Sequence, residues 1–287
     1  MNDSIRVLSR LLCYAVEDLK IPLEFTNHYR ASKKKLFKIN NDKSYKRRRK
    51  LNLELIRLTR KTVDYADDAL GVMKKYSCTG SSIQLASIIA ALNHFIPLVE
   101  NVVSQAHRRI VKGEEVPSSE KIVSIFEEHT DIISKGSRNV VFGHKNTITT
   151  GKSGLVLSVD IHDGNPADST LVKRVVNTHV DFYKSIPKSA VFDGCYSSQE
   201  NRDFAENISI DEVCFSKETD EQSSLSRAKR KKLRNFRAGI EATVSMLMRM
   251  FGLKRIMNKG IESFRATVKA AVVTYNLFIL SRTKLTT

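Results

Sequence analysis

Cysteine is scarce in this sequence, and its spacing excludes two common kinds of small domain. The four cysteines are Cys13, Cys78, Cys195 and Cys214, and no two of them form a CxxC pair. A disulfide framework or a structural zinc site needs regularly or closely spaced cysteines. We therefore expect buried free thiols in a reducing cytoplasm.

Long apolar runs are also lacking. The longest run near the end, Ala270–Leu280, contains Asn276 and is shorter than the roughly 20 residues that cross a bilayer. The start of the chain shows no charged segment followed by an apolar one and a cleavage site. The sequence therefore predicts a cytoplasmic protein with no membrane partner.

Positive charge, by contrast, is in large excess. The 287 residues include 48 Lys or Arg against 31 Asp or Glu, a formal net charge of +17, which favours a polyanionic partner. Thirteen of these bases lie between Lys33 and Lys61 with only two acids, and seven more lie in Arg227–Arg237 with none. A solvated helix face is the alternative for either run, but two runs together favour contact with the backbone of double-stranded DNA.

Within the two basic runs, we expect DNA contacts from one stretch of each. No cluster of exposed aromatic residues is expected among them, which disfavours base stacking on single strands. The residues expected to contact DNA are Lys46, Arg47, Arg48, Arg49, Lys50, Lys229, Arg230, Lys231 and Lys232.

Hydrophobic periodicity changes near Pro117. Before this residue the apolar spacing is helical throughout, with Pro97 expected to kink or divide the third helix. After it, alternating strands and helices predict an α/β layer architecture. We therefore predict two regions, a basic helical region over 1–117 and an α/β core with C-terminal helices over 118–287.

Within the second region, the expected elements follow one another closely. A turn at 151–154 is expected to join two strands. The predicted strands are 140–149, 155–161, 189–192 and 211–215, and the predicted helices are 168–185, 197–206, 223–236, 238–250 and 261–281.

Two carboxylates stand out as candidate ligands. Asp193 directly follows the apolar strand 189–192, and ligands of open α/β sheets gather beyond the carboxyl ends of strands. Glu241 lies on a predicted helix, four residues after Arg237. Glu241 therefore either pairs with Arg237 or binds a hard divalent cation together with Asp193. Further polar candidates with plain structural alternatives are Asp131, His144, Asp160, His162 and Asp163.

Longer blocks of sequence then carry a resemblance. They are SIFEEHTDIISKG (124–136), FGHK (142–145), SGLVLSVDIHDGNPADSTL (153–171), AVFDG (190–194), LRNFRAGIEATVSMLMRMFGL (233–253) and GIESFRATV (260–268). In these blocks and their order, the chain resembles insertion-sequence transposases of the ISNCY group, within the DDE transposase superfamily. The resemblance runs from the start of the chain to its end.

The resemblance implies an RNase H-like mixed sheet with a helical insertion, here residues 1–117, after its first strand. It also implies metal-dependent cleavage and strand transfer of an insertion sequence, with Mg²⁺ or Mn²⁺ at a two-metal site made by Asp-Asp-Glu. Asp193 matches the second acid, Glu241 the third, and Arg237 the arginine before that glutamate. The implied partners are insertion-sequence ends and, by analogy, further copies of the chain.

The sequence departs from the family pattern at two places. The family's first acid lies on a strand upstream of the segment that resembles Asn2–Leu12, whereas this sequence enters that helix directly from Met1. The lysine expected seven residues after the glutamate is replaced by Met248, with Arg249 beside it. We therefore expect a sheet that lacks its first strand and an inactive, N-terminally truncated transposase. A non-catalytic DNA-binding fragment or an inhibitor of transposition is the alternative.

Overall fold

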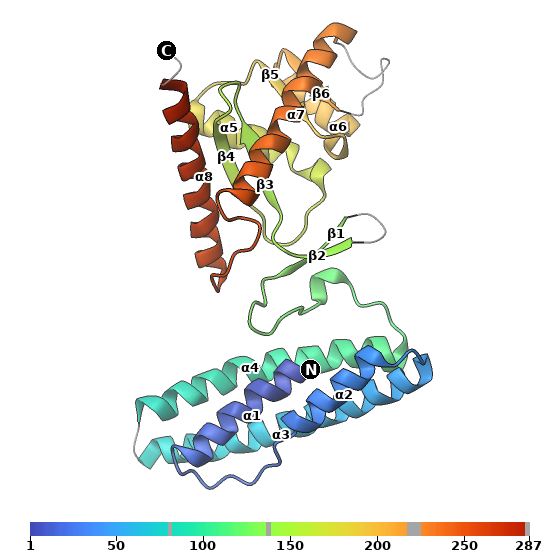
Figure 1. Ribbon diagram of the computed structural model, residues 1–287, viewed down its shortest axis with the longest axis vertical. Coiled ribbons are helices and arrows are strands. Elements are labelled where there is room, and N and C mark those ends of the chain that lie inside the picture. The colour runs from blue at the N-terminus through green and yellow to red at the C-terminus, as the bar shows by residue number, and fades with distance from the viewer. Residues whose placement is uncertain (80–81, 136–138, 217–224, 285–287) are drawn as a thin grey trace. The chain divides into compact units, whose positions relative to one another are not determined.

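The chain divides after Thr130 into two units, each with its own hydrophobic core (Figure 1). The computed structural model describes residues 1–79, 82–135, 139–216 and 225–284. The sequence analysis placed a boundary after residue 117, and the residues from there to Thr130 belong to the first unit.

The first unit is helical, as its periodicity predicts. Its elements are α1 (Asn2–Glu17), α2 (Tyr29–Asn41), α3 (Tyr45–Thr79), α4 (Ile83–His107), a π-helical turn (Arg108–Lys112) and a 3-10 turn (Ser118–Glu120). Of the two effects expected of Pro97, a kink or a division of the helix, the division does not occur, because α4 runs through this residue. A proline removes one backbone donor, and packing along the rest of a long helix compensates for this loss.

The core of the first unit lies between α1, α3 and α4. Leu8 and Leu12 from α1, Met73 from α3, and Leu92 and Val99 from α4 are all fully buried there. Their spacing within each helix follows the three-to-four residue period that places side chains on one face. The apolar stripes seen in the sequence are therefore the faces that form this core.

One stretch of the first unit, Ile83–Lys112, is long and apolar enough to cross a membrane by length and composition alone. Its buried residues, including Leu85, Ile88, Leu92 and Ile96, belong to the core with α1 and α3. Packing in this core accounts for the apolar composition of α4.

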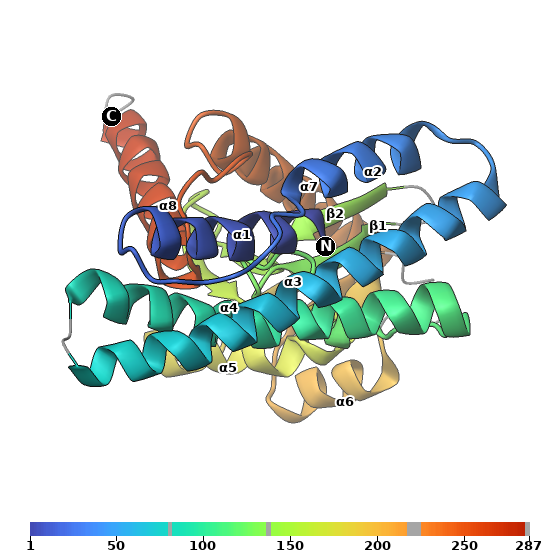
Figure 2. The same ribbon diagram turned by 90° about the horizontal axis from the view of Figure 1, so that it is seen from below.

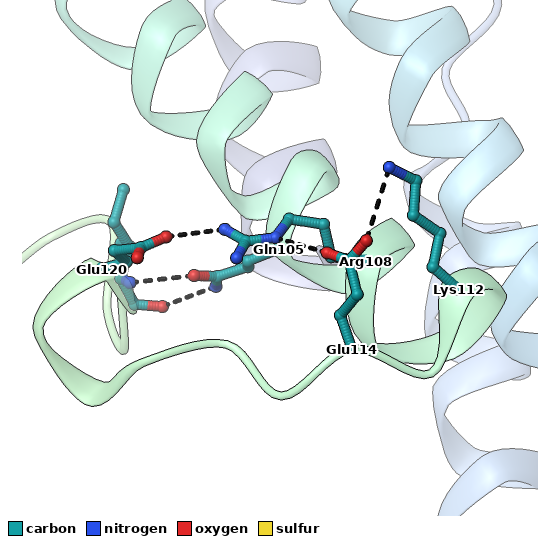
Figure 3. A network of polar contacts seen from close by, with 6 residues as sticks. Gln105, Arg108, Lys112, Glu114 and Glu120 are labelled. Atoms are coloured by element: carbon teal, nitrogen blue, oxygen red, sulfur yellow. Dashed lines mark hydrogen bonds and ion pairs between the residues drawn. The ribbon is translucent and has the colours of Figure 1, made fainter.

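Polar side chains fold the segment after α4 back onto the end of that helix (Figure 3). Arg108 pairs with Glu114 through Nε at 2.9 Å and with Glu120 through Nη1 at 2.6 Å. Hydrogen bonding to Arg108 lowers the pKa of the Glu114 carboxyl. Gln105 accepts from the amide of Ile122 and donates to its carbonyl, at 3.0 and 2.9 Å. These contacts hold the segment to the first unit.

The described residues of the second unit form three two-stranded sheets. They are β1 (Asp131–Lys135) with β2 (Asn139–Gly143), antiparallel, β3 (Asn146–Thr150) with β4 (Val156–Ile161), antiparallel, and β5 (Ser189–Phe192) with β6 (Glu212–Phe215), parallel. The turn predicted at 151–154 joins β3 to β4, and Gly154 there has a φ of 79°, which favours glycine. The single strand predicted over 140–149 is wrong, because His144 and Lys145 separate β2 from β3.

Four helices accompany these strands, and they are α5 (Val172–Tyr183), α6 (Gln199–Asn207), α7 (Arg227–Arg249) and α8 (Ile261–Lys284). The expectation of two helices over 223–236 and 238–250 is wrong, since α7 is continuous through Gly239. A β-carbon at Gly239 would meet no atom within 4 Å, so no close approach of another segment breaks the helix there.

The same helices contact both the β3–β4 hairpin and the β5–β6 pair. On α5, Val172 packs in a core with Phe215 of β6, and Arg174 pairs with Asp160 of β4 at 3.7 Å. On α7, Leu247 packs against Val156 of β4, while the start of this helix contacts β5 and β6. The two pairs of strands are therefore held by a shared set of helices, although they are not hydrogen-bonded to each other.

The outer edge of β4 is covered by a side chain from α8. The amide of Asn276 accepts from the backbone N–H of Val156 at 2.8 Å and donates to its carbonyl at 2.9 Å. An uncovered strand edge exposes backbone groups that pair with other strands, and Asn276 prevents this at Val156. Asn276 therefore has a structural role within the apolar run of α8.

Core truncations are expected to destabilise the two units separately. Leu92→Ala in the first unit and Phe215→Ala in the second each remove a fully buried side chain, at a cost of about 2–5 kcal/mol. Amide hydrogen exchange of the full chain is expected to rise within residues 1–130 for the first variant and within 131–287 for the second. Leu277→Ala, at a 61% exposed position, is the control. Faster exchange throughout the chain in either core variant would show that the units unfold together.

Candidate active site

One arginine links the two candidate carboxylates. Arg237 contacts Asp193 Oδ1 through Nη2 at 3.3 Å and Glu241 Oε1 through Nη1 at 3.4 Å. The pairing of Arg237 with Glu241, one of the two alternatives for this acid, is therefore confirmed. The second contact brings Asp193, 44 positions earlier in the sequence than Arg237, to the same guanidinium.

The end of β5 positions Asp193. The strand stops at Phe192, and Asp193 caps the following 3-10 turn, Gly194–Tyr196, by accepting from the amide of Gly194 at 2.6 Å. Ser216, the residue after β6, donates its hydroxyl to Asp193 Oδ1 at 3.1 Å. Because β5 and β6 are parallel with Phe192 beside Phe215, the residues that follow them meet at one edge. Ser216 was not predicted, although the strand end at Phe215 was.

The helix α7 positions the other two residues. Arg237 and Glu241 are four residues apart, which places them on one face of a helix. The Glu241 side chain is 69% exposed and that of Asp193 is 47% exposed, whereas that of Arg237 is 27% exposed. Both carboxylates are therefore open to solvent beside a more buried cation.

The donor atoms of this site are suited to a hard divalent cation. Mg²⁺ prefers carboxylate oxygens and is commonly held by one or two of them together with water. Asp193 and Glu241 supply two carboxylates, and their common partner Arg237 keeps these like charges near each other without a metal. Among the residues that the structure describes, no group of three or more His, Cys, Asp or Glu side chains gathers at one point. The described donors thus fit one cation and do not make a complete two-metal site.

A buried chain of hydroxyl and imidazole groups lies next to this strand end. The Thr147 side chain of β3 lies close enough to the hydroxyl of Tyr196, three residues after Asp193, to act against the rise in the pKa of that hydroxyl. Thr147 contacts His162 Nε2 at 2.7 Å, and the two side chains belong to residues that are 7% and 2% exposed. Burial raises the pKa of the Tyr196 hydroxyl, and Asp168 and Asp193 add to the shift. This chain connects the strand end that bears Asp193 to the β3–β4 hairpin.

Acid is expected to destabilise the chain through His162. Burial, assisted by Arg174, lowers the pKa of His162 below its usual value of 6.5. The unfolded chain therefore binds a proton near that pH while the folded chain does not. The free energy of unfolding should accordingly fall as the pH drops from about 6.5 toward the lower pKa of the folded state. In urea unfolding between about pH 8 and about pH 5, His162→Gln is expected to reduce this slope.

The control for this prediction is His94→Gln, which removes an exposed histidine of α4. It is expected to leave the pH dependence of wild-type unfolding in place. Equal slopes for the wild type and the His162 variant would remove His162 as the source of acid sensitivity.

The other polar candidates have structural partners of their own. Asp131 pairs with His144 Nδ1 at 3.7 Å, and the His144 ring lies 4.6 Å from that of Phe264. Asp163 pairs with Arg265 at 2.9 Å, and Asp160 pairs with Arg174 as described above. The expectation of buried cysteine thiols is met by Cys214, which is buried, but not by Cys195, which is exposed.

The basic residues expected to contact DNA are exposed, with one exception. Lys46–Lys50 at the start of α3 are all exposed, as are Lys229, Lys231 and Lys232 on α7. Arg230 is only 4% exposed and shares the inner face of α7 with Leu233, so it is not available to a duplex on that surface. Lys229 pairs with Glu212 at 2.8 Å, and the hydrogen bond raises the pKa of Lys229 and lowers that of Glu212.

Comparison with known protein families gives one match, which covers the second unit almost entirely. The model of a family described as transposase DDE domain matches residues 128–277, more than half of the chain. Asp193, Arg237 and Glu241 all lie within the matched residues. No curated protein and no solved structure matches the chain.

Proposed function

Because the chain belongs to the transposase DDE-domain family, we propose that it is a DNA transposase that cleaves and joins the ends of an insertion sequence in a metal-dependent reaction. The observation that carries this proposal is the contact of one guanidinium with both Asp193 and Glu241. A strand end and a helix thereby present two exposed carboxylates at a single point. The alternative is a DNA-binding fragment or inhibitor without catalysis, which is favoured because the described residues bring two acids, and not three, to this point.

In the proposed site, Asp193 and Glu241 bind and orient Mg²⁺ or Mn²⁺. Ser216 and the amide of Gly194 fix the Asp193 carboxylate through hydrogen bonds to Oδ1. Arg237 holds both carboxylates in place and, as a cation at the same point, attracts a DNA phosphate. The chemistry that bound divalent ions supply in such sites is activation of water or a 3′-hydroxyl and stabilisation of the leaving 3′-oxygen.

We further propose that β3–β4 and β5–β6 are parts of one RNase H-like sheet, with a further strand between β3 and β5. The Thr147 side chain at the start of β3 lies near the hydroxyl of Tyr196, which follows the end of β5. The outer edge of β4 is already covered by Asn276. A strand in this position would be parallel to β5 and antiparallel to β3, and the resemblance places the first acid of the family on it.

DNA binding is assigned to the exposed lysines and arginines of the two basic runs. Lys46–Lys50 at the start of α3, together with Lys229, Lys231 and Lys232 on α7, are proposed to contact phosphates. Such contacts position a duplex without reading its sequence. The proposed partners are double-stranded DNA with insertion-sequence ends and, by analogy with transposases that act on paired ends, a second copy of the chain.

A cleavage assay distinguishes the two functions. The full chain is incubated with a duplex that carries an insertion-sequence end, with Mg²⁺, with Mn²⁺ or with EDTA, and nicked and joined products are separated on a denaturing gel. Metal-dependent cleavage supports the transposase. Binding without cleavage supports the fragment. Failure to bind DNA contradicts both functions.

A further inference from the structure

The connection between α2 and α3 carries two highly exposed aromatic side chains. Phe37, in the last turns of α2, is 70% exposed, and Tyr45, the first residue of α3, is 76% exposed. Among the described residues, Phe182 on α5 is the only other aromatic side chain that is at least 70% exposed. Exposed large aromatic groups that lie close in the sequence mark contact surfaces more often than exposed single residues do.

The same region is the most basic of the chain. We call residues 33–50 the α2–α3 corner. Besides its two aromatic residues it contains nine exposed basic residues, which are Lys33, Lys34, Lys38, Lys43, Lys46, Arg47, Arg48, Arg49 and Lys50. Its one acid, Asp42, is occupied within the turn, where it accepts from the amide of Ser44 at 2.8 Å and pairs with Arg47 at 3.6 Å. The corner therefore attracts a polyanion.

Side-chain contacts fix the corner before any partner binds. An ion pair between Lys35 and Glu54 ties α2 to α3, and it lowers the pKa of the Glu54 carboxyl. The Arg49 guanidinium donates to the carbonyl of Ile110 at 3.2 Å, which ties the start of α3 to the end of the π-helical turn. Figure 2 shows α2 and α3 joined by a short connection. Little ordering of the scaffold is thus required on binding.

The combination of charge and exposed rings selects one class of partner. A purely apolar protein surface would desolvate nine cationic groups without pairing them, which is costly. A nucleic acid offers phosphates to the lysines and arginines, and flat apolar faces of its nucleobases to the aromatic rings. In an intact duplex the base faces are covered by stacking, so only unpaired nucleotides present them to an aromatic side chain.

We propose that the α2–α3 corner binds single-stranded DNA adjoining a duplex, with Phe37 and Tyr45 stacked on unpaired bases and the surrounding lysines and arginines on phosphates. This inference rests on the proposed function for the presence of DNA, and adds the structural form of the DNA that the corner selects. It reverses the expectation from sequence that base stacking is disfavoured, because periodicity did not reveal that both rings face solvent.

The absence of tryptophan from the sequence allows a direct test. Phe37→Trp and Tyr45→Trp each give the full chain a single indole. Titration with a duplex that carries a single-stranded tail is expected to quench its fluorescence, and a blunt duplex of the same paired sequence is expected to quench it less. Phe182→Trp, at the third exposed ring, is the matched control and should not respond to the tail.

Affinity measurements complete the test. The double variant Phe37→Ala/Tyr45→Ala is expected to bind tailed DNA about thirtyfold more weakly or worse and blunt duplex as the wild type does, while Phe182→Ala leaves both affinities unchanged. Equal affinity of the wild type for both DNAs, with no quenching by the tail, would overturn the inference and leave the proposed function intact. Loss of self-association without an effect on DNA binding would overturn it in favour of a protein interface. A wild-type chain that binds neither DNA contradicts the proposed function itself.

Discussion

Substitution of Lys46, Arg48 and Lys50 by glutamine is expected to weaken binding of the chain to duplex DNA by about 500-fold at about 0.1 M monovalent salt. Each lysine or arginine that contacts a phosphate releases a counterion from the DNA. Loss of three contacts should therefore reduce the magnitude of the slope of log K, where K is the association constant, against log salt concentration by about 2.7. Fluorescence anisotropy of a labelled blunt duplex, titrated at several salt concentrations, measures both quantities.

The choice of these three residues follows from the contacts of their neighbours. Arg47 pairs with Asp42, and Arg49 donates to the carbonyl of Ile110, so both already have partners within the first unit. Lys46, Arg48 and Lys50 are exposed on the first turns of α3. We therefore expect them to provide a larger share of the phosphate contacts.

A control with the same change of net charge separates local contact from bulk attraction. Lys254, Arg255 and Lys259 are exposed and lie outside both basic runs, and their substitution by glutamine also removes three positive charges from the formal net charge of +17. This variant is expected to bind within about twofold of the wild type, because charges beyond the Debye length of about 10 Å are screened. An equal loss of affinity in the two variants would show that the start of α3 is not the contact surface.

The sequence predicted the local elements best where a single periodic pattern spans them. The helices α1, α3 and α4 and the strand before Asp193 followed from apolar spacing, because each buries one face in a core. The strand predicted over 140–149 failed because two different partners divide it: Asn139–Gly143 pairs with β1, and Asn146–Thr150 pairs with β4. Alternation within one segment does not reveal where one pairing partner gives way to the next.

In the candidate site, a contact within one helix could be predicted from the sequence, whereas contacts between different elements could not. The pairing of Arg237 with Glu241 could be predicted, since the two residues are one helical turn apart. The contact of Arg237 with Asp193, and the hydroxyl that Ser216 donates, depend on how α7 and β6 pack beside β5. Arg230 was misjudged for a related reason, because its position in a basic run gives no indication of which face of α7 is buried.

Loss of either carboxylate is expected to abolish metal-dependent chemistry at this site. Asp193→Asn and Glu241→Gln should each reduce DNA cleavage by about a thousandfold or more, since stabilisation of charge by a bound metal is worth several kcal/mol and each 1.36 kcal/mol is about tenfold in rate. Both substitutions keep the size of the side chain, and the amide oxygen introduced by Asp193→Asn would still accept from Gly194 and Ser216. Mn²⁺ binding, measured by electron paramagnetic resonance, should weaken in parallel.

The measurement of Mn²⁺ binding tests the site whether or not the chain cleaves DNA by itself. If the acid that completes the site lies outside the described residues, Mn²⁺ binding is still expected to depend on Asp193 and Glu241. Asp203→Asn and Glu206→Gln, at exposed acids of α6 in the same unit, are the matched controls and should bind Mn²⁺ as the wild type does. Wild-type Mn²⁺ binding in the Asp193 variant would contradict the site, because Asp193 would then contribute nothing to holding the metal.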